Sequence, residues 1–552
     1  MKCFRSAFLS AFFCLVVASS AFSASALPVI FSEKVPEEAS FVVHFSTEDF
    51  GSCLKKIVLA LDFEVQDWRV SASDFVVSKK SRKTGKRLYL EKISSTLVPD
   101  RAYLSDGLGN ALSGSGSFVT LEFDVRPERF DELDMLTTGL SKKIANLDDF
   151  YAYSVDSKKL GISCKNCRGF VNANASRFQF CTYEGKMELF DEDGDFDGVE
   201  KIPLNYACYK PSAASGEKIP LVVWFHGLGE GGKNRLAPIL NAKVTNLVSD
   251  EIQSKFPSGF YLLVPQCPSA WLMVNERTVG GVHYWAPVDK DGVKSKISGG
   301  VSTAKNAVKG TVRLPFRFVR NRFRSALGKE PLPYYGDDDD DDDDEDEEDD
   351  DENEDEEIDN EEDDEEDDDE PVSDKYLANR IEMGKLPFAS VSYYTFVVKD
   401  LIDAFVAENP QIDSSRVFVG GCSAGGYMTM NMVFQFRDFF RAAFPVCEFY
   451  LDSKITDEQI EFLSGFPLFF TYAENDGTVN PKKSSEPTIS RIKRIGSDKL
   501  RSTVYPDVRD KSGSFKGEDG GAYQYEGHSS WIYVLNNDNG VFDWLASFPP
   551  SE

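Results

Sequence analysis

RVFVGGCSAG, residues 416–425, is a short apolar run that ends in a glycine-rich turn. A helical pattern follows from Ala424 to about Phe436. The G-x-S-x-G from Gly421 to Gly425 is typical of a nucleophile elbow, a strained strand-to-helix turn that exposes a serine hydroxyl at the top of a sheet. A bare G-x-S-x-G also occurs in ordinary glycine turns, so its neighbours along the chain must support this interpretation. The stretch predicts Ser423 as a candidate nucleophile.

Two further elements follow in the chain order that such a site requires, which is serine, then an acid, then histidine. The apolar run from Phe466 to Tyr472 ends in AENDG, so Asp476 is expected on a loop at the carboxyl end of a strand. The segment GHSSW, which contains His528, follows about one element later. The chain has four histidines, and His528 is the one placed to act as a base.

The chemistry explains why these residue types belong together. A serine hydroxyl is a poor nucleophile, so an imidazole must take its proton, and a carboxylate must orient the imidazole and stabilise its charged form. We therefore predict a catalytic triad of Ser423, Asp476 and His528. Asp507 remains the alternative acid, and it ranks lower because a polar, glycine-rich loop follows it.

A second loop predicts where a developing oxyanion would bind. The buried strand expected at residues 220–225 ends in HGLGEGG, residues 226–232. In such sites one backbone N–H comes from the loop after this strand, and another comes from the residue after the nucleophile. We predict the amides of Gly227 or Leu228 together with that of Ala424, and His226 is then structural.

The chain begins with features of an exported protein. Residues 1–26 combine a basic start, a short apolar run and the small residues Ala24-Ser25-Ala26, which is typical of a cleaved signal peptide. No other segment is apolar and long enough to span a membrane. We expect a periplasmic or secreted protein.

Removal of the signal peptide leaves eight of the ten cysteines, and an even number in an exported protein permits disulfides. A zinc site at Cys164, Cys167, Cys181 and Cys208 is less favoured, because the spacing is wrong for a second C-x-x-C. We expect no metal and no cofactor.

The expected organisation has two folded regions. Short alternating runs within residues 27–125, such as Phe41 to Phe45 and Phe118 to Val125, predict an all-β sandwich of immunoglobulin-like size. Residues 126–200 are more polar and are expected to connect it to an α/β region at 201–550, with a mostly parallel sheet and helices on both faces.

The run from Ile202 to Trp544 resembles the secreted α/β-hydrolase family of esterases and predicted peptidases related to polyhydroxybutyrate depolymerases and feruloyl esterases. With a β-sandwich in front, the chain is similar to the esterase branch that carries an immunoglobulin-like N-terminal domain. The resemblance implies the α/β-hydrolase fold, the triad and ester hydrolysis. The matching segments are 220–234, VPQCP at 264–268, 412–417, the elbow with Gly426, Asp476 with Val479, and 527–531.

A long insertion at about 287–371 departs from this family pattern. Residues 290–329 are basic, and residues 337–370 contain 31 of the 92 acidic residues, so the remaining 61 acids balance the 61 lysines and arginines. Such a self-repelling tract is expected to be a disordered spacer. Weak calcium binding by the tract and a role of the insertion as a lid stay open as alternatives. Nucleic-acid binding by the basic part is not expected, because the adjacent polyanion would compete with phosphate.

The sequence therefore predicts an exported serine carboxylesterase that forms an acyl-enzyme and acts on a small-molecule or polysaccharide-linked ester. Two alternatives remain. One is a serine peptidase that uses the same triad, and the other is a surface or periplasmic binding protein on a non-catalytic hydrolase scaffold.

Overall fold

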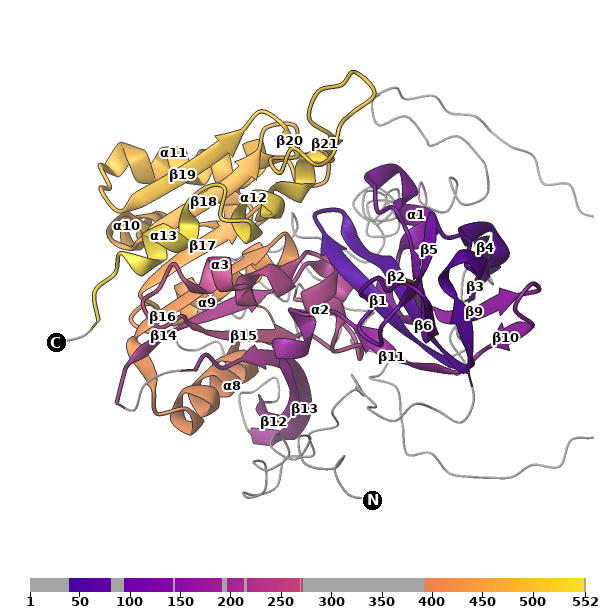
Figure 1. Ribbon diagram of the computed structural model, residues 1–552. Helices are drawn as coiled ribbons and strands as arrows, with labels where there is room; N and C mark the ends of the chain where they lie inside the picture. Colours follow the sequence, from indigo (N-terminus) through magenta and orange to yellow (C-terminus); the bar gives the residue numbers. More distant parts are fainter. Residues whose placement is uncertain are drawn as a thin grey trace, which may run out of the picture.

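The computed structural model of the protein describes residues 39–80, 94–141, 144–190, 196–212, 216–268, 270–271, 392 and 394–550 (Figure 1). The predicted signal peptide at 1–26 and the predicted insertion at 287–371 lie outside these residues.

The N-terminal region contains two packed sheets. Apolar residues of the first sheet, such as Val43 and Leu59, share one buried core with Val77 and Val155 of the second. The pairings are antiparallel except for the parallel pair of β1 (Ser40–Glu48) and β11 (Cys167–Val171). The first sheet has the order β11 (Cys167–Val171), β1 (Ser40–Glu48), β2 (Gly51–Gln66), β6 (Ser115–Glu122) and β5 (Arg101–Ser105), and the second has the order β10 (Ile162–Cys164), β9 (Ala152–Ser157), β3 (Val76–Lys80) and β4 (Ser94–Leu97).

Residues 126–200 differ from the connecting segment that the sequence predicts. After the short helix α1 (Phe130–Leu133) and the hairpin of β7 (Leu136–Ser141) and β8 (Ile144–Phe150), the strands β9, β10 and β11 complete the two N-terminal sheets. The next strand, β12 (Gln179–Phe190), already belongs to the large C-terminal sheet. Strand pairing therefore moves both expected boundaries, because the N-terminal sheets extend to Val171 and the C-terminal sheet begins at Gln179.

The C-terminal region is built on an eight-stranded sheet. The first two pairings, at one edge of the sheet, are antiparallel, and all the following pairings are parallel. The order is β12, β13 (Phe196–Tyr209), β15 (Tyr261–Gln266), β14 (Ile219–Phe225), β16 (Ile412–Cys422), β17 (Ala442–Val446), β18 (Leu468–Ala473) and β19 (Leu500–Tyr505). A small hairpin of β20 (Val508–Arg509) and β21 (Gln524–Tyr525) follows.

Helices cover both faces of this sheet, as the sequence predicts. Along β14, Leu221 and Val223 face one buried cluster whereas Val222 and Trp224 face another, which is why the strand is apolar throughout. The first cluster includes α8 (Thr395–Glu408), α9 (Ala424–Gln435), α10 (Asp457–Gly465) and α11 (Ser485–Ile495). The second includes α2 (Ala237–Leu240), α3 (Asp250–Gln253), α12 (Trp531–Leu535) and α13 (Val541–Ala546).

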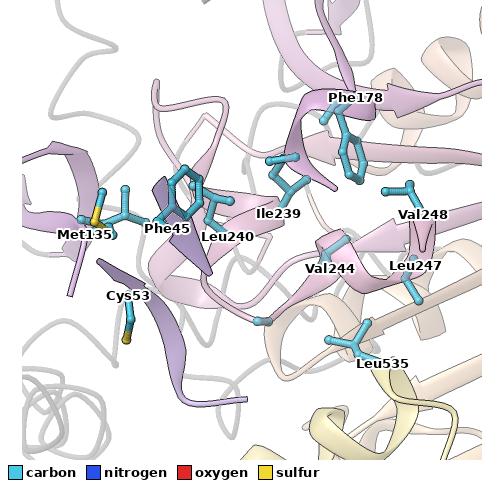
Figure 2. Packing of buried hydrophobic residues seen from close by; sticks show 14 of the residues in the cluster. Phe45, Cys53, Met135, Phe178, Ile239, Leu240, Val244, Leu247, Val248 and Leu535 are labelled. Atoms are coloured by element: carbon cyan, nitrogen blue, oxygen red, sulfur yellow. The ribbon is translucent and has the colours of Figure 1, made fainter. Parts of the chain in front are cut away.

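The two regions share a continuous apolar core. Figure 2 shows Phe45 of β1 next to Leu240 of α2, with Met135 and Ile239 in the same cluster. Polar contacts join the regions as well, because Ser52 Oγ donates to the carbonyl oxygen of Leu240 at 2.9 Å. The N-terminal sheets are therefore packed against the α2 face of the C-terminal region.

Candidate active site

Ser423 lies at a sharp turn between β16 and α9. Its backbone angles are φ 57° and ψ −116°, a conformation that residues with a side chain rarely adopt. Its amide donates to the carbonyl oxygen of Val446 at 2.9 Å, which ties the turn to the end of β17. This strained turn is the geometry that the G-x-S-x-G pattern predicts, and it lies at the carboxyl ends of the parallel strands.

The two outer glycines are required because β14 passes directly against the elbow. A Cβ atom on Gly425 would lie 2.0 Å from the carbonyl oxygen of Phe225, and one on Gly421 would lie 2.5 Å from the same oxygen. Real Cβ atoms do not approach backbone atoms so closely. The elbow can therefore form only if both positions lack a side chain.

Asp476 and His528 form a buried pair close to this turn. His528 Nδ1 lies 2.8 Å from Asp476 Oδ2, and the two residues are 7% and 8% exposed, respectively. The second oxygen of Asp476 accepts hydrogen bonds from the amides of Thr478 and Val479 at 2.9 and 2.8 Å. Because a carboxylate can only accept, the Asp476 contact favours a proton on Nδ1 and leaves Nε2 free to act as a base.

The environment of His528 favours its charged form. Burial lowers the pKa of the ring, but the nearby Cys447 and Asp476 raise it, and the net pKa is well above the usual value. Glu526 is a further acid beside His528, and burial raises the pKa of its carboxyl group. This carboxyl accepts a hydrogen bond from Thr478 Oγ1 at 3.2 Å.

Cys447 is the residue at β17's carboxyl end that lies beside Ser423. Cys422 and Val446 are paired across β16 and β17, so Ser423 and Cys447 are the next residue on each strand. Among the described residues no hydrogen bond joins Ser423 Oγ directly to His528. Catalytic hydrogen bonds are often long in enzymes without substrate and shorten in the reacting complex.

Among the described residues, no hydrogen bond or ion pair joins Asp507 to His528. Its carboxylate instead pairs with Arg509, with an Nη2 to Oδ2 distance of 2.7 Å. The structure therefore brings Asp476, and not the alternative acid, to the histidine.

The loop after β14 carries the predicted oxyanion amides. The Gly227 amide donates to Glu230 Oε2 at 2.6 Å, so this N–H is already engaged. Leu228 opens the 3-10 helix Leu228–Glu230, and Ala424 opens α9. The first amides of a helix have no acceptor within it, so Leu228 and Ala424 are the better candidates of the three.

His226 has the structural role that the sequence predicts. The Cys267 amide donates to His226 Nε2 at 3.0 Å, so the ring proton is on Nδ1, which donates to the Gly227 carbonyl oxygen at 2.6 Å. Burial lowers the pKa of His226 to about 4. His44 also has a pKa of about 4, because of burial and the charge of Lys56. His283 lies outside the described residues.

Sequence reasoning did not assign roles to Glu230, Glu526 or Cys447. Burial raises the pKa of Glu230 to about 7, and its Oε1 is buried without a hydrogen bond. Glu230 contacts Gly227, three residues earlier, but only in the folded loop, whereas the contact of Glu526 with Thr478 joins distant segments. The position of Cys447 at the end of a core strand was the one available signal.

The cysteines provide no covalent link in the described part of the chain, where all eight are thiols. Over the same residues, no group of three or more His, Cys, Asp or Glu side chains could hold a metal ion. No helix among the described residues is long and apolar enough to cross a membrane.

One family of known proteins matches part of the C-terminal region. The model of the prolyl oligopeptidase family matches residues 397–488, which contain Ser423 and Asp476. No curated protein matches the sequence.

Solved structures extend the comparison to most of the chain. The crystal structure of a thermostable esterase matches with a TM-score of 0.52 and 17% identity, and the match covers 92% of this chain and 99% of that one. A ferulic acid esterase matches with a TM-score of 0.31 and 9% identity over 66% of this chain and 99% of that one. An acylaminoacyl peptidase matches with a TM-score of 0.30 and 11% identity over 96% of this chain and 79% of that one.

The predicted fold is confirmed by the parallel sheet, its helices and the match to the thermostable esterase. The C-terminal region has the α/β-hydrolase fold, and a strand-rich domain precedes it. The fold and the family match together support a hydrolase.

Proposed function

Starting from this α/β-hydrolase fold, we propose that the protein is an exported serine hydrolase that cleaves carboxylic esters through an acyl-enzyme. Ser423 is the nucleophile, His528 is the general base and acid, and Asp476 orients His528. The observation that supports the proposal most strongly is the buried 2.8 Å contact between His528 Nδ1 and Asp476 Oδ2, at the sheet edge where Ser423 lies in its strained turn.

The reaction can be derived from these positions. As Ser423 Oγ attacks the ester carbonyl carbon, its proton moves to His528 Nε2 and the carbonyl oxygen becomes an oxyanion. The amides of Leu228 and Ala424 donate hydrogen bonds to this oxyanion. His528 then gives its proton to the leaving alcohol, and water repeats the sequence on the acyl-enzyme to release the acid.

The first experiment is hydrolysis of a series of p-nitrophenyl esters by the mature protein and by Ser423→Ala. The proposal expects turnover by the wild type and a loss of about 10³-fold or more in the variant, since removal of one triad member leaves little beyond oxyanion binding. A fluorophosphonate should label the wild type at Ser423 and leave the variant unlabelled. Absence of both turnover and labelling in the wild type would favour the non-catalytic binding scaffold.

A serine peptidase is the second candidate, and the match of residues 397–488 to the prolyl oligopeptidase family supports it. The same triad can cleave amides, although an ester has the better leaving group. Parallel assays with peptidyl p-nitroanilides separate the two. A kcat/KM for anilides that exceeds the value for every ester would make the peptidase the better assignment.

Export and the insertion need separate tests. The apolar start of the chain supports cleavage after residue 26, which N-terminal sequencing of the protein from culture medium and periplasm would check.

A version without residues 337–370 tests whether the acidic tract limits access to the site. Higher activity of this version would support a lid, and an unchanged kcat/KM would support a spacer.

A further inference from the structure

We propose that Glu230 is a positioning residue of the same reaction, whose buried carboxyl group holds the loop after β14 in the conformation that presents the Leu228 amide to the oxyanion. The inference rests on the proposed function, because it assigns a role in the oxyanion site of that reaction. In this role Glu230 touches no reacting atom and acts through the backbone of the loop.

The loop needs contacts that fix its backbone. Residues 226–232 have the sequence HGLGEGG, in which four of the seven residues are glycine. Glycine has the widest choice of backbone angles and loses the most conformational freedom on folding. Oxyanion donors are most effective when they are in place before the charge develops. A loop of this composition can provide such a donor only if other groups hold it.

Two successive peptide groups of the loop are held at three of their four polar atoms. In the first, the His226 carbonyl oxygen accepts a hydrogen bond from Trp271 Nε1 at 3.1 Å. The amide of the same group, that of Gly227, donates to Glu230 Oε2 at 2.6 Å. In the second, the Gly227 carbonyl oxygen accepts from His226 Nδ1 at 2.6 Å. The described residues provide no backbone acceptor for the fourth polar atom, the Leu228 amide, which therefore remains for the oxyanion.

The planar peptide group transmits these contacts to Leu228. The carbonyl oxygen and the N–H of a trans peptide point in opposite directions, so the contacts of Gly227 also set the direction of the Leu228 amide. The carbonyl oxygen of Glu230 accepts from Gln266 Nε2 at 3.0 Å, which ties Glu230 to the end of β15. Glu230 is 2% exposed, so water has little access to its carboxyl group. Glu230 therefore connects the Gly227 amide to the framework of the sheet.

The held loop lies directly beside the nucleophile. A Cβ atom on Gly227 would lie 3.9 Å from the carbonyl oxygen of Cys422, the residue before Ser423. A Cβ atom on Gly425 would lie 2.8 Å from the carbonyl oxygen of His226. The loop that carries the Leu228 amide and the turn that carries the Ala424 amide are therefore in contact, and a shift of the loop changes the distance between the two donors.

The test compares Glu230→Met and Glu230→Gln with the wild type. Methionine has a similar length but no acceptor oxygen, whereas glutamine keeps an oxygen for the Gly227 amide. The kcat and KM values for one p-nitrophenyl ester are measured together with the inhibition constant of an alkyl trifluoromethyl ketone. Ser423 Oγ adds to the carbonyl carbon of this ketone, the serine proton passes to His528, and the carbonyl oxygen becomes an oxyanion. The bound ketone therefore needs the same two amides as the reaction.

In Glu230→Met, kcat should fall and the inhibition constant should rise by a similar factor of about 30 to 100, because the loss of one oxyanion donor costs about 10²-fold or more. KM should stay within a factor of about two, because the substrate carbonyl carries no full charge before attack. Glu230→Gln should keep all three constants within about fivefold of the wild type, since its oxygen still accepts from Gly227.

Asp413→Asn is the control for general damage. Asp413 is 3% exposed and accepts from Arg416 Nε at 2.7 Å, at the amino end of β16 and thus away from the site. Loss of this buried ion pair should lower the temperature of thermal unfolding and leave kcat and the inhibition constant unchanged. If Glu230→Met fails to fold, Glu230→Asp carries the test. Its carboxylate is one methylene shorter, so its kcat should fall below that of Glu230→Gln although the charge is kept.

A folded Glu230→Met with the wild-type kcat would overturn the inference, and so would a fall in kcat with an unchanged inhibition constant. A Glu230→Asp variant as active as Glu230→Gln would overturn it as well. Ser423→Ala is assayed beside them. Inhibition of the wild type and loss of turnover in Ser423→Ala, together with unchanged constants in Glu230→Met, would overturn only the role of Glu230. Turnover that persists in Ser423→Ala would overturn the proposed function itself.

Discussion

Asp476 uses both of its carboxylate oxygens, one for His528 and one for two backbone amides. In Asp476→Asn the amide oxygen would keep the two backbone contacts, so the side-chain NH₂ would face His528 Nδ1. That nitrogen would then have to accept, and the ring proton would move to Nε2. We expect kcat to fall by about 10³- to 10⁴-fold with little change in thermal stability.

The matched control for this prediction is Asp507→Asn. Asp507 is the other acid in the same part of the chain, and its carboxylate pairs with Arg509 and not with His528. Its substitution should leave kcat within a factor of about two, since no reacting group depends on it. A larger loss in Asp507→Asn than in Asp476→Asn would reverse the assignment of the acid.

At the scale of single residues, the sequence predicts the features that depend on position along a strand. Ser423, Asp476 and His528 all belong to recognisable patterns, and the structure places them at one edge of the sheet. The choice between Gly227 and Leu228 was open because it depends on a hydrogen bond from Gly227 to Glu230, which requires the loop conformation.

Among the elements, the elbow is the one most sensitive to substitution. Gly425→Ala would place a Cβ atom 2.0 Å from the Phe225 carbonyl oxygen, and backbone at the end of a central strand cannot move away easily. We expect a loss of about 3 kcal/mol or more in the free energy of unfolding, because β14, β16 and α9 would all have to shift. Chemical denaturation of the purified variant measures this.

Gly465→Ala is the control for this prediction. Gly465 ends α10, and a Cβ atom there would contact nothing within 4 Å. Alanine should therefore leave stability unchanged or raise it by about 0.5 to 1 kcal/mol. Equal losses in the two variants would mean that the close approach of β14 does not limit the elbow.

Apolar elements were easier to predict than half-polar ones. The runs at Phe41 and Phe118 correspond to β1 and β6, and the buried run at 220–225 corresponds to β14. β12 was not recognised because it is an edge strand with one neighbour, and its sequence QFCTYEGKMELF carries many polar residues. Its pairing with β13 depends on the tertiary fold and has no strong signal of its own.

For the whole molecule, the contact between the two regions includes a buried charge. Asp49 accepts hydrogen bonds from Lys243 Nζ at 2.8 Å and from Asn536 Nδ2 at 2.9 Å, and its side chain is 5% exposed. Asp49→Ala would leave both donors without this acceptor. We expect the free energy of unfolding to fall by about 2 kcal/mol.

The control is Asp250→Ala, which removes the partner of Arg177. The Asp250 side chain is 96% exposed, so this ion pair is well solvated and its loss should cost less than about 0.5 kcal/mol. Thermal unfolding of both variants provides the comparison. An equal and small effect at Asp49 would mean that the apolar cluster around Leu240 alone holds the regions together.

The architecture was predictable because its signals are distributed along the chain. Buried runs that alternate with helical patterns predict a parallel sheet, and short alternating runs predict a β domain. The boundary between the two was placed incorrectly, because β9 to β11 return to the N-terminal sheets after a polar stretch. This pairing joins strands that are far apart in the sequence, so the composition of residues 126–200 does not predict it.

The rings of Trp271 and Tyr394 lie with their centroids 6.1 Å apart, although 122 positions separate them in the numbering. Trp271 Nε1 also donates to the His226 carbonyl oxygen at 3.1 Å, and Ser392 donates its amide to Asn431 at 3.1 Å. The described residues on either side of positions 272–391 are therefore each held to the C-terminal region by their own hydrogen bonds. We therefore expect that the sequence between positions 271 and 392 can change in length or composition while the catalytic framework keeps its contacts.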